Sequence, residues 1–175
     1  MRAATSTSTL RRWMQSRWRT PSHCWNKLNT EGAQSGLNGS AAFDGVLRSS
    51  AGTRLVGFSK SIDICTSPMA ELWGVLEGLV HAWNYGERRI IVELDNAEAI
   101  GGPQGRVVSG IPLWIIQHMF ATMDIDRVVL VQHSFRENNK VADCLAKDAR
   151  KKNGVDRVYF APPDKFRERR KGKKH

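Results

Sequence analysis

The chain has 175 residues, of which 41% are hydrophobic and 25% are charged. This length and composition fit one globular domain and leave little room for a second. No apolar run approaches the ~20 residues that a membrane span needs. Cys24, Cys65 and Cys144 are widely spaced, so neither a disulfide framework nor a zinc site of Cys-x-x-Cys spacing is indicated. These features favour an intracellular protein, nuclear or cytoplasmic, without a membrane partner.

The net charge of +10 is concentrated at the two ends of the chain. Residues 1–30 contain six Lys or Arg and no acidic residue, and residues 147–175 contain twelve Lys or Arg and four acidic residues. Residues 31–146 contain nine basic and thirteen acidic residues, so the middle of the chain is mildly acidic. Basic ends are typical of proteins that bind polyanions such as nucleic acid, although a solubilising tail has the same pattern.

The N-terminal segment, residues 1–24, lacks hydrophobic periodicity, and we expect it to be disordered. Its lack of acidic residues fits either a transit peptide or an upstream part of a longer polyprotein. The patterned domain, residues 25–160, begins with three stretches typical of β-strands: Trp25–Gly32, Ala41–Arg48 and Thr53–Ser59. Turn residues separate these stretches, which predicts a three-stranded meander.

A helix is predicted next, because Ser67-Pro68 supplies a cap followed by a proline and Gly86 supplies a stop. Small residues repeat every fourth position along one face of this helix: Ala70, Gly74, Gly78 and Ala82. A glycine costs a helix interior about 1 kcal/mol. Two glycines at this spacing therefore indicate close packing against a sheet.

The remaining elements alternate between strand and helix. We predict the strand Arg89–Leu94, the short helix Asp95–Ile100, the helix Pro112–Met123, the strand Ile125–Gln132 and the helix Glu137–Lys152. The order β-β-β-α-β-α-β-α predicts an α/β fold with a mixed five-stranded sheet flanked by helices. Residues 161–175 form a basic C-terminal tail.

Four carboxylates lie at strand ends and helix starts, where this topology can bring them together. They are Glu31, Glu71, Asp95 and Asp143. Each has a structural alternative, such as a helix-dipole interaction for Glu71 or an N-cap for Asp95. As a set they are crowded hard oxygen ligands, which repel one another in the absence of cations. Because in-line phosphodiester cleavage uses two Mg²⁺ ions about 4 Å apart, the set predicts a two-metal nuclease in which Mn²⁺ can substitute.

Four short motifs resemble those of plant ribonuclease H-like (type I ribonuclease H) domains associated with non-LTR retrotransposon reverse transcriptases. WNKLNTEGA at 25–33 is similar to the family's KLNTDGA, AELW at 70–73 to AELWA, and VELDN at 92–96 to VELDS. The stretch at 133–146 is similar to H-x-x-R-E-x-N-x-x-A-D-x-LA. Four motifs in order, at compatible spacing over about residues 25–160, are a specific signal. The resemblance implies a ribonuclease H-like fold and a monomeric enzyme that hydrolyses the RNA strand of RNA/DNA hybrids.

The resemblance also implies roles for individual residues. Glu71, Asp95 and Asp143 match three of the family's four metal ligands, and His133 matches a catalytic histidine that assists phosphate hydrolysis or product release. The residues implied to contact nucleic acid are Asn38, Arg136 and Asn139, the last of which is expected one helical turn before Asp143. Glu93 shares a strand face with Asp95 but falls outside the ligand position of the motif.

The chain departs from the family at Glu31, where the family has an aspartate. The additional methylene shifts this carboxylate by about 1.5 Å, and a misplacement of that size slows a reaction by ~10²-fold. Asn38 is also displaced by one position, because Gly-Leu-Asn-Gly replaces the family's Gly-Asn-Pro-Gly turn. Three functions therefore stay open: an active hybrid ribonuclease, a catalytically weak or inactive nucleic-acid-binding relic of a retrotransposon, and a structural domain of a retrotransposon-derived polyprotein.

Overall fold

The computed structural model describes residues 19–96, 99, 101, 111–140 and 157–159. Three strands come first: β1 (Asn26–Gln34), β2 (Ser40–Arg48) and β3 (Arg54–Ile64). They are followed by α2 (Ser67–Asn84), β4 (Arg89–Leu94), α4 (Leu113–Met123) and β5 (Val128–His133). A single-turn 3-10 helix, η1 (Arg136–Asn138), and the short strand β6 (Arg157–Tyr159) complete the described elements.

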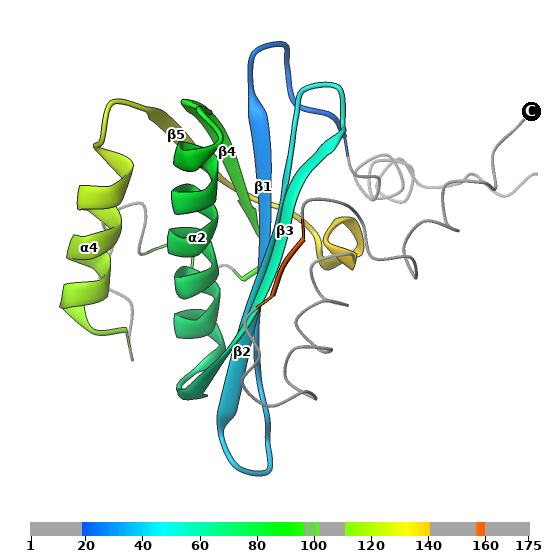
Figure 1. Ribbon diagram of the computed structural model, residues 1–175. Helices are drawn as coiled ribbons and strands as arrows, with labels where there is room; N and C mark the ends of the chain where they lie inside the picture. Colours follow the sequence, from blue (N-terminus) through cyan, green and yellow to red (C-terminus); the bar gives the residue numbers. More distant parts are fainter. Residues whose placement is uncertain (1–18, 97–98, 100, 102–110, 141–156, 160–175) are drawn as a thin grey trace, which may run out of the picture.

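The strands form one mixed sheet in the order β5-β4-β1-β2-β3-β6 (Figure 1). β1 pairs with β2 in antiparallel and with β4 in parallel orientation, and β4 pairs in parallel with β5. This arrangement confirms the predicted α/β fold with its five strands. The sixth strand, β6, adds to the edge of β3. It was not predicted, because three residues are too few to show a strand pattern.

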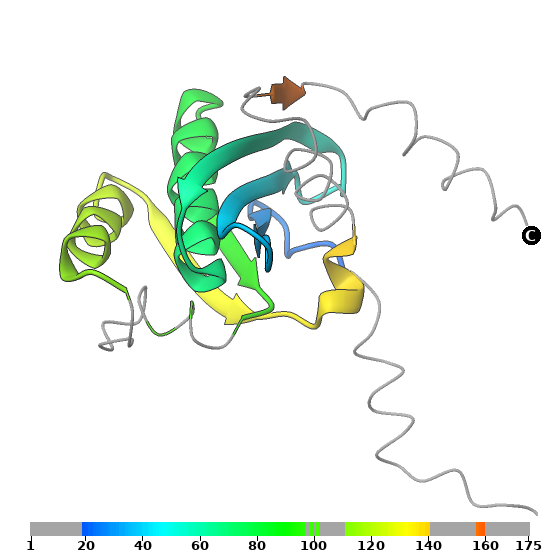
Figure 2. The same ribbon diagram turned by 90° about the horizontal axis from the view of Figure 1, so that it is seen from below.

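Both α2 and α4 lie on one side of the sheet, with α4 beside α2 (Figures 1 and 2). The hydrophobic core fills the space between these helices and the central strands. Its fully or almost fully buried members include Leu28, Phe43, Leu72, Leu79, Ile115 and Met119. Neither helix is long and apolar enough to cross a membrane.

The start of α2 differs by one residue from the expected cap. Thr66 is the N-cap, and its hydroxyl oxygen accepts a hydrogen bond from the Met69 N–H at 3.4 Å. Ser67, the expected cap, is the first helical residue and donates instead to the Gly32 carbonyl at 3.1 Å. The predicted stop is confirmed, since Gly86 follows the helix with a φ of +81°, a conformation that suits glycine.

Close packing of α2 against the sheet, predicted from its glycines, is also confirmed. A Cβ atom on Gly78 would lie 2.6 Å from both Cδ atoms of Leu28. A Cβ atom on Gly74 would approach Thr30 and Phe43 only to 3.4 Å, which is ordinary contact. The absence of a side chain at Gly78 is therefore what allows the helix axis to approach β1.

We expect Gly78→Ala to lower the free energy of unfolding by about 1–3 kcal/mol, the usual cost of overpacking a core. Leu28 is fully buried, so its side chain has no room to move aside. Gly74→Ala is the matched control, because it carries the same gain in helix propensity of about 1 kcal/mol without a clash. Urea unfolding of both variants measures the difference. Equal stability of the two variants would contradict close packing at Gly78.

Three element boundaries differ from the sequence-based prediction. β1 continues to Gln34, so Glu31 lies within the strand and not at its end. β3 continues to Ile64, because its pairing with β2 extends to the end of that hairpin. β5 begins at Val128 and not at Ile125, since Asp124 caps α4 and Asp126 has a φ of +31°, so the intervening residues form a turn. The predicted helices at 95–100 and 137–152 lie mostly outside the described residues.

Candidate active site

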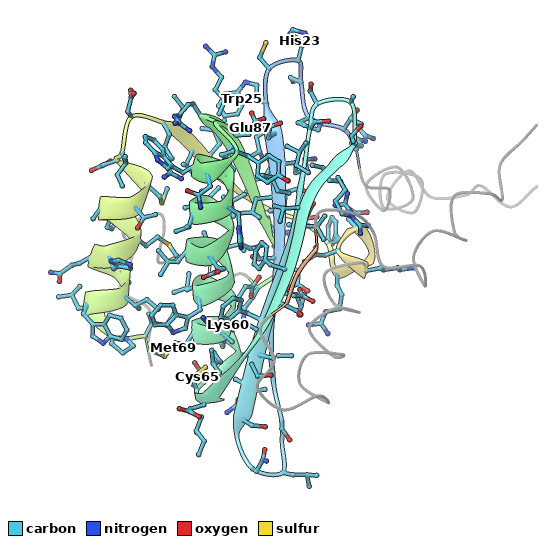
Figure 3. The ribbon with its side chains drawn as sticks, viewed as in Figure 1. His23, Trp25, Lys60, Cys65, Met69 and Glu87 are labelled. Carbon is cyan, nitrogen blue, oxygen red and sulfur yellow. The ribbon has the colours of Figure 1, made fainter. Side chains whose placement is uncertain are left out.

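A cavity of about 410 Å³ opens beside the N-terminal end of α2. Glu31 of β1, Glu71 of α2 and Asp95, directly after β4, lie on its wall. The other lining residues are Gly32, Ser67, Asn96, His133, Phe135 and Arg136. In Figure 3, Cys65 and Met69 mark this end of α2, and Glu87 and Trp25 mark the opposite end. The structure therefore brings together three of the four predicted carboxylates, with His133 and Arg136 beside them.

Gly32 allows Glu31 and Glu71 to share one cavity. A Cβ atom at this position would lie 2.4 Å from the Glu71 backbone nitrogen and 2.6 Å from the Ser67 carbonyl oxygen. These are backbone atoms, so a side chain on Gly32 would push the start of α2 away from β1. Glu71 lies just beyond the first turn of α2 and not within it as the sequence predicted, because the helix begins one residue earlier than expected.

The carboxylate of Glu71 is buried and only partly satisfied by hydrogen bonds. It accepts the backbone N–H groups of Asp95 and Asn96, but Oε1 has no hydrogen-bond partner among the described residues. Burial raises the pKa of Glu71 well above its usual value, and the negative charges of Asp95 and Glu31 raise it further. The two backbone hydrogen bonds lower this pKa by a smaller amount. Glu71 is therefore short of positive charge, which a bound cation would supply.

Arg136 at the start of η1 is the cation that faces the other two carboxylates. Its Nε donates to Asp95 Oδ2 at 2.9 Å, and its Nη2 lies 3.6 Å from Glu31 Oε1. The carboxylate side chains are only 7% and 4% exposed, whereas the Arg136 side chain is 71% exposed. The resemblance implied a nucleic-acid contact for Arg136, and the structure shows it paired with two proposed metal ligands.

His133 and Phe135 form an aromatic edge of the cavity. His133 ends β5, and its Nε2 lies 3.2 Å from the Asp95 carbonyl oxygen. The His133 and Phe135 rings meet edge to face, with centroids 5.4 Å apart. Phe135 is 44% exposed. Sequence reasoning missed it, because the family motif leaves its position unspecified and one exposed aromatic carries no signal.

The remaining predicted site residues lie elsewhere. Asn139 is buried and not helical, and its Nδ2 donates to the Thr30 carbonyl. The expected placement of Asn139 inside a helix is therefore wrong, since the 3-10 turn of η1 ends there. Asn38 is exposed in the β1–β2 turn, where its Oδ1 accepts hydrogen bonds from Ser40, and it does not line the cavity. Asp143 lies outside the described residues.

Glu93 does not line this cavity. It forms an ion pair with Lys27 at 2.9 Å. It also accepts hydrogen bonds from Asn29 and Gln132, both at 2.8 Å. The Glu93 carboxylate is therefore ion-paired and hydrogen-bonded within the sheet by neighbours on two strands, β1 and β5.

The donor set of the cavity fits hard divalent cations. Carboxylate oxygens are the ligands that Mg²⁺ prefers. Glu31, Glu71 and Asp95 bring three carboxylates into one cavity, and Glu71 Oε1 has no hydrogen-bond partner among the residues described by the structure. In the observed side-chain conformations, no group of three His, Cys, Asp or Glu residues in the described part of the chain is arranged so that it could coordinate one metal ion. Arg136 instead pairs with two of the carboxylates.

Comparisons with known proteins agree with this architecture. The chain matches the reverse transcriptase-like family over residues 29–149. It is 37% identical over 130 residues to an Arabidopsis thaliana protein named "Putative ribonuclease H protein". That match covers 74% of this chain but only 21% of the Arabidopsis protein. The chain therefore spans about a fifth of the length of this relative.

Solved structures show the same fold. The N-terminal RNase H domain of a Mycobacterium tuberculosis protein is 25% identical, with a TM-score of 0.67, and the match covers 73% of this chain and 94% of that one. LC11-RNase H1 in complex with an RNA/DNA hybrid is 23% identical, with a TM-score of 0.64 and coverage of 73% and 97%. Because the family match covers more than half of the chain, this protein belongs to the reverse transcriptase-like family, and its fold is that of ribonuclease H.

Proposed function

We propose that this protein is a metal-dependent endonuclease that hydrolyses the RNA strand of RNA/DNA hybrids. The observation that carries the proposal is the cavity shared by Glu31, Glu71 and Asp95, in which the buried Glu71 Oε1 has no hydrogen-bond partner in the part of the chain that the structure describes. The name of the Arabidopsis relative and the hybrid bound to LC11-RNase H1 support the choice of substrate.

The proposed ligands of two Mg²⁺ ions are Glu31, Glu71 and Asp95, with Asp143 as the fourth, and Mn²⁺ is the proposed substitute. When bound, such ions make a water molecule nucleophilic and stabilise the leaving oxygen of an in-line displacement. Glu31 and Asp95 are held by the central strands β1 and β4, and Glu71 by the start of α2. These rigid elements keep the carboxylates in place, so little reorganisation is needed during the reaction.

Three other side chains on the cavity wall have proposed roles toward the substrate. His133 is exposed beside Asp95, where its imidazole can give a proton to the departing oxygen. The guanidinium of Arg136 can form a forked pair of hydrogen bonds with a phosphate. Phe135 offers an exposed ring on which a base can stack. Recognition of the RNA strand would use its 2′-hydroxyl groups.

The deciding experiment is cleavage of an end-labelled RNA/DNA hybrid by the full chain in Mg²⁺ or Mn²⁺. DNA and RNA duplexes of the same sequence and a reaction with EDTA are the controls. We expect cuts in the RNA strand of the hybrid alone and none with EDTA. Intact hybrid in both metals, with the protein folded by circular dichroism, would contradict the proposed activity.

Binding without cleavage is a second candidate function that two observations favour. Glu31 replaces the aspartate of the family, and Arg136 pairs with Glu31 and Asp95 in the cavity. A binding relic would retain salt-sensitive affinity for the hybrid and leave both strands intact. The same cleavage experiment, combined with a binding titration, separates the two functions.

We expect deletion of residues 164–175 to weaken hybrid binding and to flatten its dependence on salt. This segment contains seven Lys or Arg and two acidic residues, and each phosphate contact adds to the slope of log affinity against log salt. Fluorescence anisotropy at several salt concentrations measures that slope. A full-length variant with these basic residues changed to Gln controls for chain length. An unchanged slope would show that the tail does not contact nucleic acid.

A further inference from the structure

We propose that Arg136 is an exchangeable counter-cation of the active site. In the absence of divalent ions it pairs with Glu31 and Asp95, and when these carboxylates bind metal it is released to a phosphate of the nucleic acid. Metal and nucleic acid would then support each other's binding through one side chain. The inference rests on the proposed function, because it takes the two carboxylates to be metal ligands.

One guanidinium reaches two carboxylates that come from different strands. Asp95 follows β4 and Glu31 belongs to β1, and their side chains are almost completely buried. A buried carboxylate is strongly disfavoured unless it is paired or hydrogen-bonded. The 2.9 Å hydrogen bond to Asp95 and the 3.6 Å approach to Glu31 supply that pairing from a single residue.

The exposure of the Arg136 side chain allows it to exchange its carboxylate partners for another anion. The Arg136 side chain is 71% exposed, so it can leave the carboxylates without repacking the core. Ion pairs with an exposed partner are weak, since water screens the charges and the long side chain loses conformational entropy. The planar fork of arginine donors fits a phosphate as well as a carboxylate.

Arg136 also leaves the negative charge of the site incompletely compensated. It contacts two of the three carboxylates, and Glu71 Oε1 has no partner among the described residues. Two divalent ions carry four positive charges, against one for a guanidinium, and would repel it from the cavity. The released guanidinium would then lie at the rim, where a polyanion approaches.

The first test is Mn²⁺ binding by the full chain without nucleic acid, measured from the electron paramagnetic resonance signal of free Mn²⁺. We expect Arg136→Gln to bind Mn²⁺ about fivefold more tightly than the unaltered protein, because the competing cation is absent. Lys140→Gln is the matched control for the loss of one exposed positive charge nearby in the chain, and we expect it to change the affinity little. Equal affinity in the Arg136→Gln and Lys140→Gln proteins would overturn the inference, as would the lack of Mn²⁺ binding by every form.

The second test is a double-mutant cycle of hybrid binding in EDTA, where no metal-dependent cleavage occurs. Asp95→Asn removes the negative charge that makes the closer of the two contacts with Arg136. It therefore mimics the release of the Arg136 side chain that metal binding would cause. We expect Asp95→Asn to raise hybrid affinity about threefold more when Arg136 is present than in the Arg136→Gln background. Additive effects of the two substitutions would overturn the release of Arg136 to nucleic acid.

These measurements are separable from the proposed nuclease activity. If the protein cleaves hybrids but the Arg136→Gln and Lys140→Gln proteins bind Mn²⁺ with equal affinity, the inference fails and the proposed activity stands. If Arg136→Gln binds Mn²⁺ more tightly and the cycle is non-additive, but no hybrid is cleaved, the inference stands and the nuclease proposal fails.

Discussion

The Asp95→Asn protein should lose all measurable hybrid cleavage, a reduction of ~10³-fold or more. Asp95 lies between the other components of the site, since its carboxylate lines the cavity, its N–H is bonded to Glu71 and its carbonyl oxygen contacts His133. Asparagine keeps the size and both backbone contacts but supplies a neutral and weaker ligand. The measurement is single-turnover cleavage in Mg²⁺ and in Mn²⁺. Residual activity within tenfold of the unaltered protein would remove Asp95 from the proposed ligand set.

Glu93→Gln is the matched control for this loss, because Glu93 is a second almost buried carboxylate only two residues away. The Glu93 carboxylate forms an ion pair with Lys27, whose side chain is also almost buried. Removal of one partner from a buried ion pair leaves the other charge uncompensated, which typically costs about 3–5 kcal/mol. We therefore expect Glu93→Gln to unfold at lower urea concentration while its folded fraction retains cleavage. Asp95→Asn should therefore lower the cleavage rate, and Glu93→Gln should lower the free energy of unfolding, although the two residues lie at the same end of β4.

The sequence was sufficient to place Glu31, Glu71 and Asp95 in one cavity. Asp95 follows β4 directly and Glu71 lies near the start of α2, whereas Glu31 lies within β1, which continues to Gln34. Strand ends and helix starts meet at one edge of an α/β sheet whatever the details of packing, and Glu31 is close enough to that edge to share the cavity. The close approach of α2 to β1 was also predictable, because Gly78 has no other reason to lie inside a helix. Local sequence patterns and topology were therefore enough to predict the position of a residue when that position depends mainly on the helix or strand to which the residue belongs.

Features that depend on side chains from several elements could not be predicted. The sequence marks Arg136 as a motif residue, but its pairing with Glu31 and Asp95 requires η1, β1 and the end of β4 at their final distances. The helix cap illustrates a local ambiguity, since Thr66 and Ser67 both carry a hydroxyl and only the contact of Ser67 with Gly32 decides between them. Asn139 was misplaced because the motif spacing does not reveal the 3-10 turn before it.

The substitution Glu31→Asp should accelerate hybrid cleavage in Mg²⁺ by ~10-fold or more, equivalent to about 1.4 kcal/mol of the activation barrier. Glutamate places its carboxylate one methylene farther from β1, where Oε1 comes within 3.6 Å of Arg136 Nη2. The shorter aspartate would draw the ligand back toward the strand and away from that competing cation. Mg²⁺ should benefit most, since it requires near-ideal octahedral geometry at about 2.0–2.1 Å.

Mn²⁺ binds such oxygen sites with less demand on geometry and should partly rescue the protein that carries Glu31. The rate ratio of Mn²⁺ to Mg²⁺ should therefore fall on Glu31→Asp, and this ratio is independent of the amount of active protein. Equal rates and an unchanged ratio would mean that Glu31 is not a ligand or that another part of the site limits the reaction. Asp95→Asn in the same background distinguishes these outcomes, because it abolishes the activity only if the metal-dependent site produces it. If that double variant retained the rate of Glu31→Asp, neither carboxylate would belong to the reacting centre.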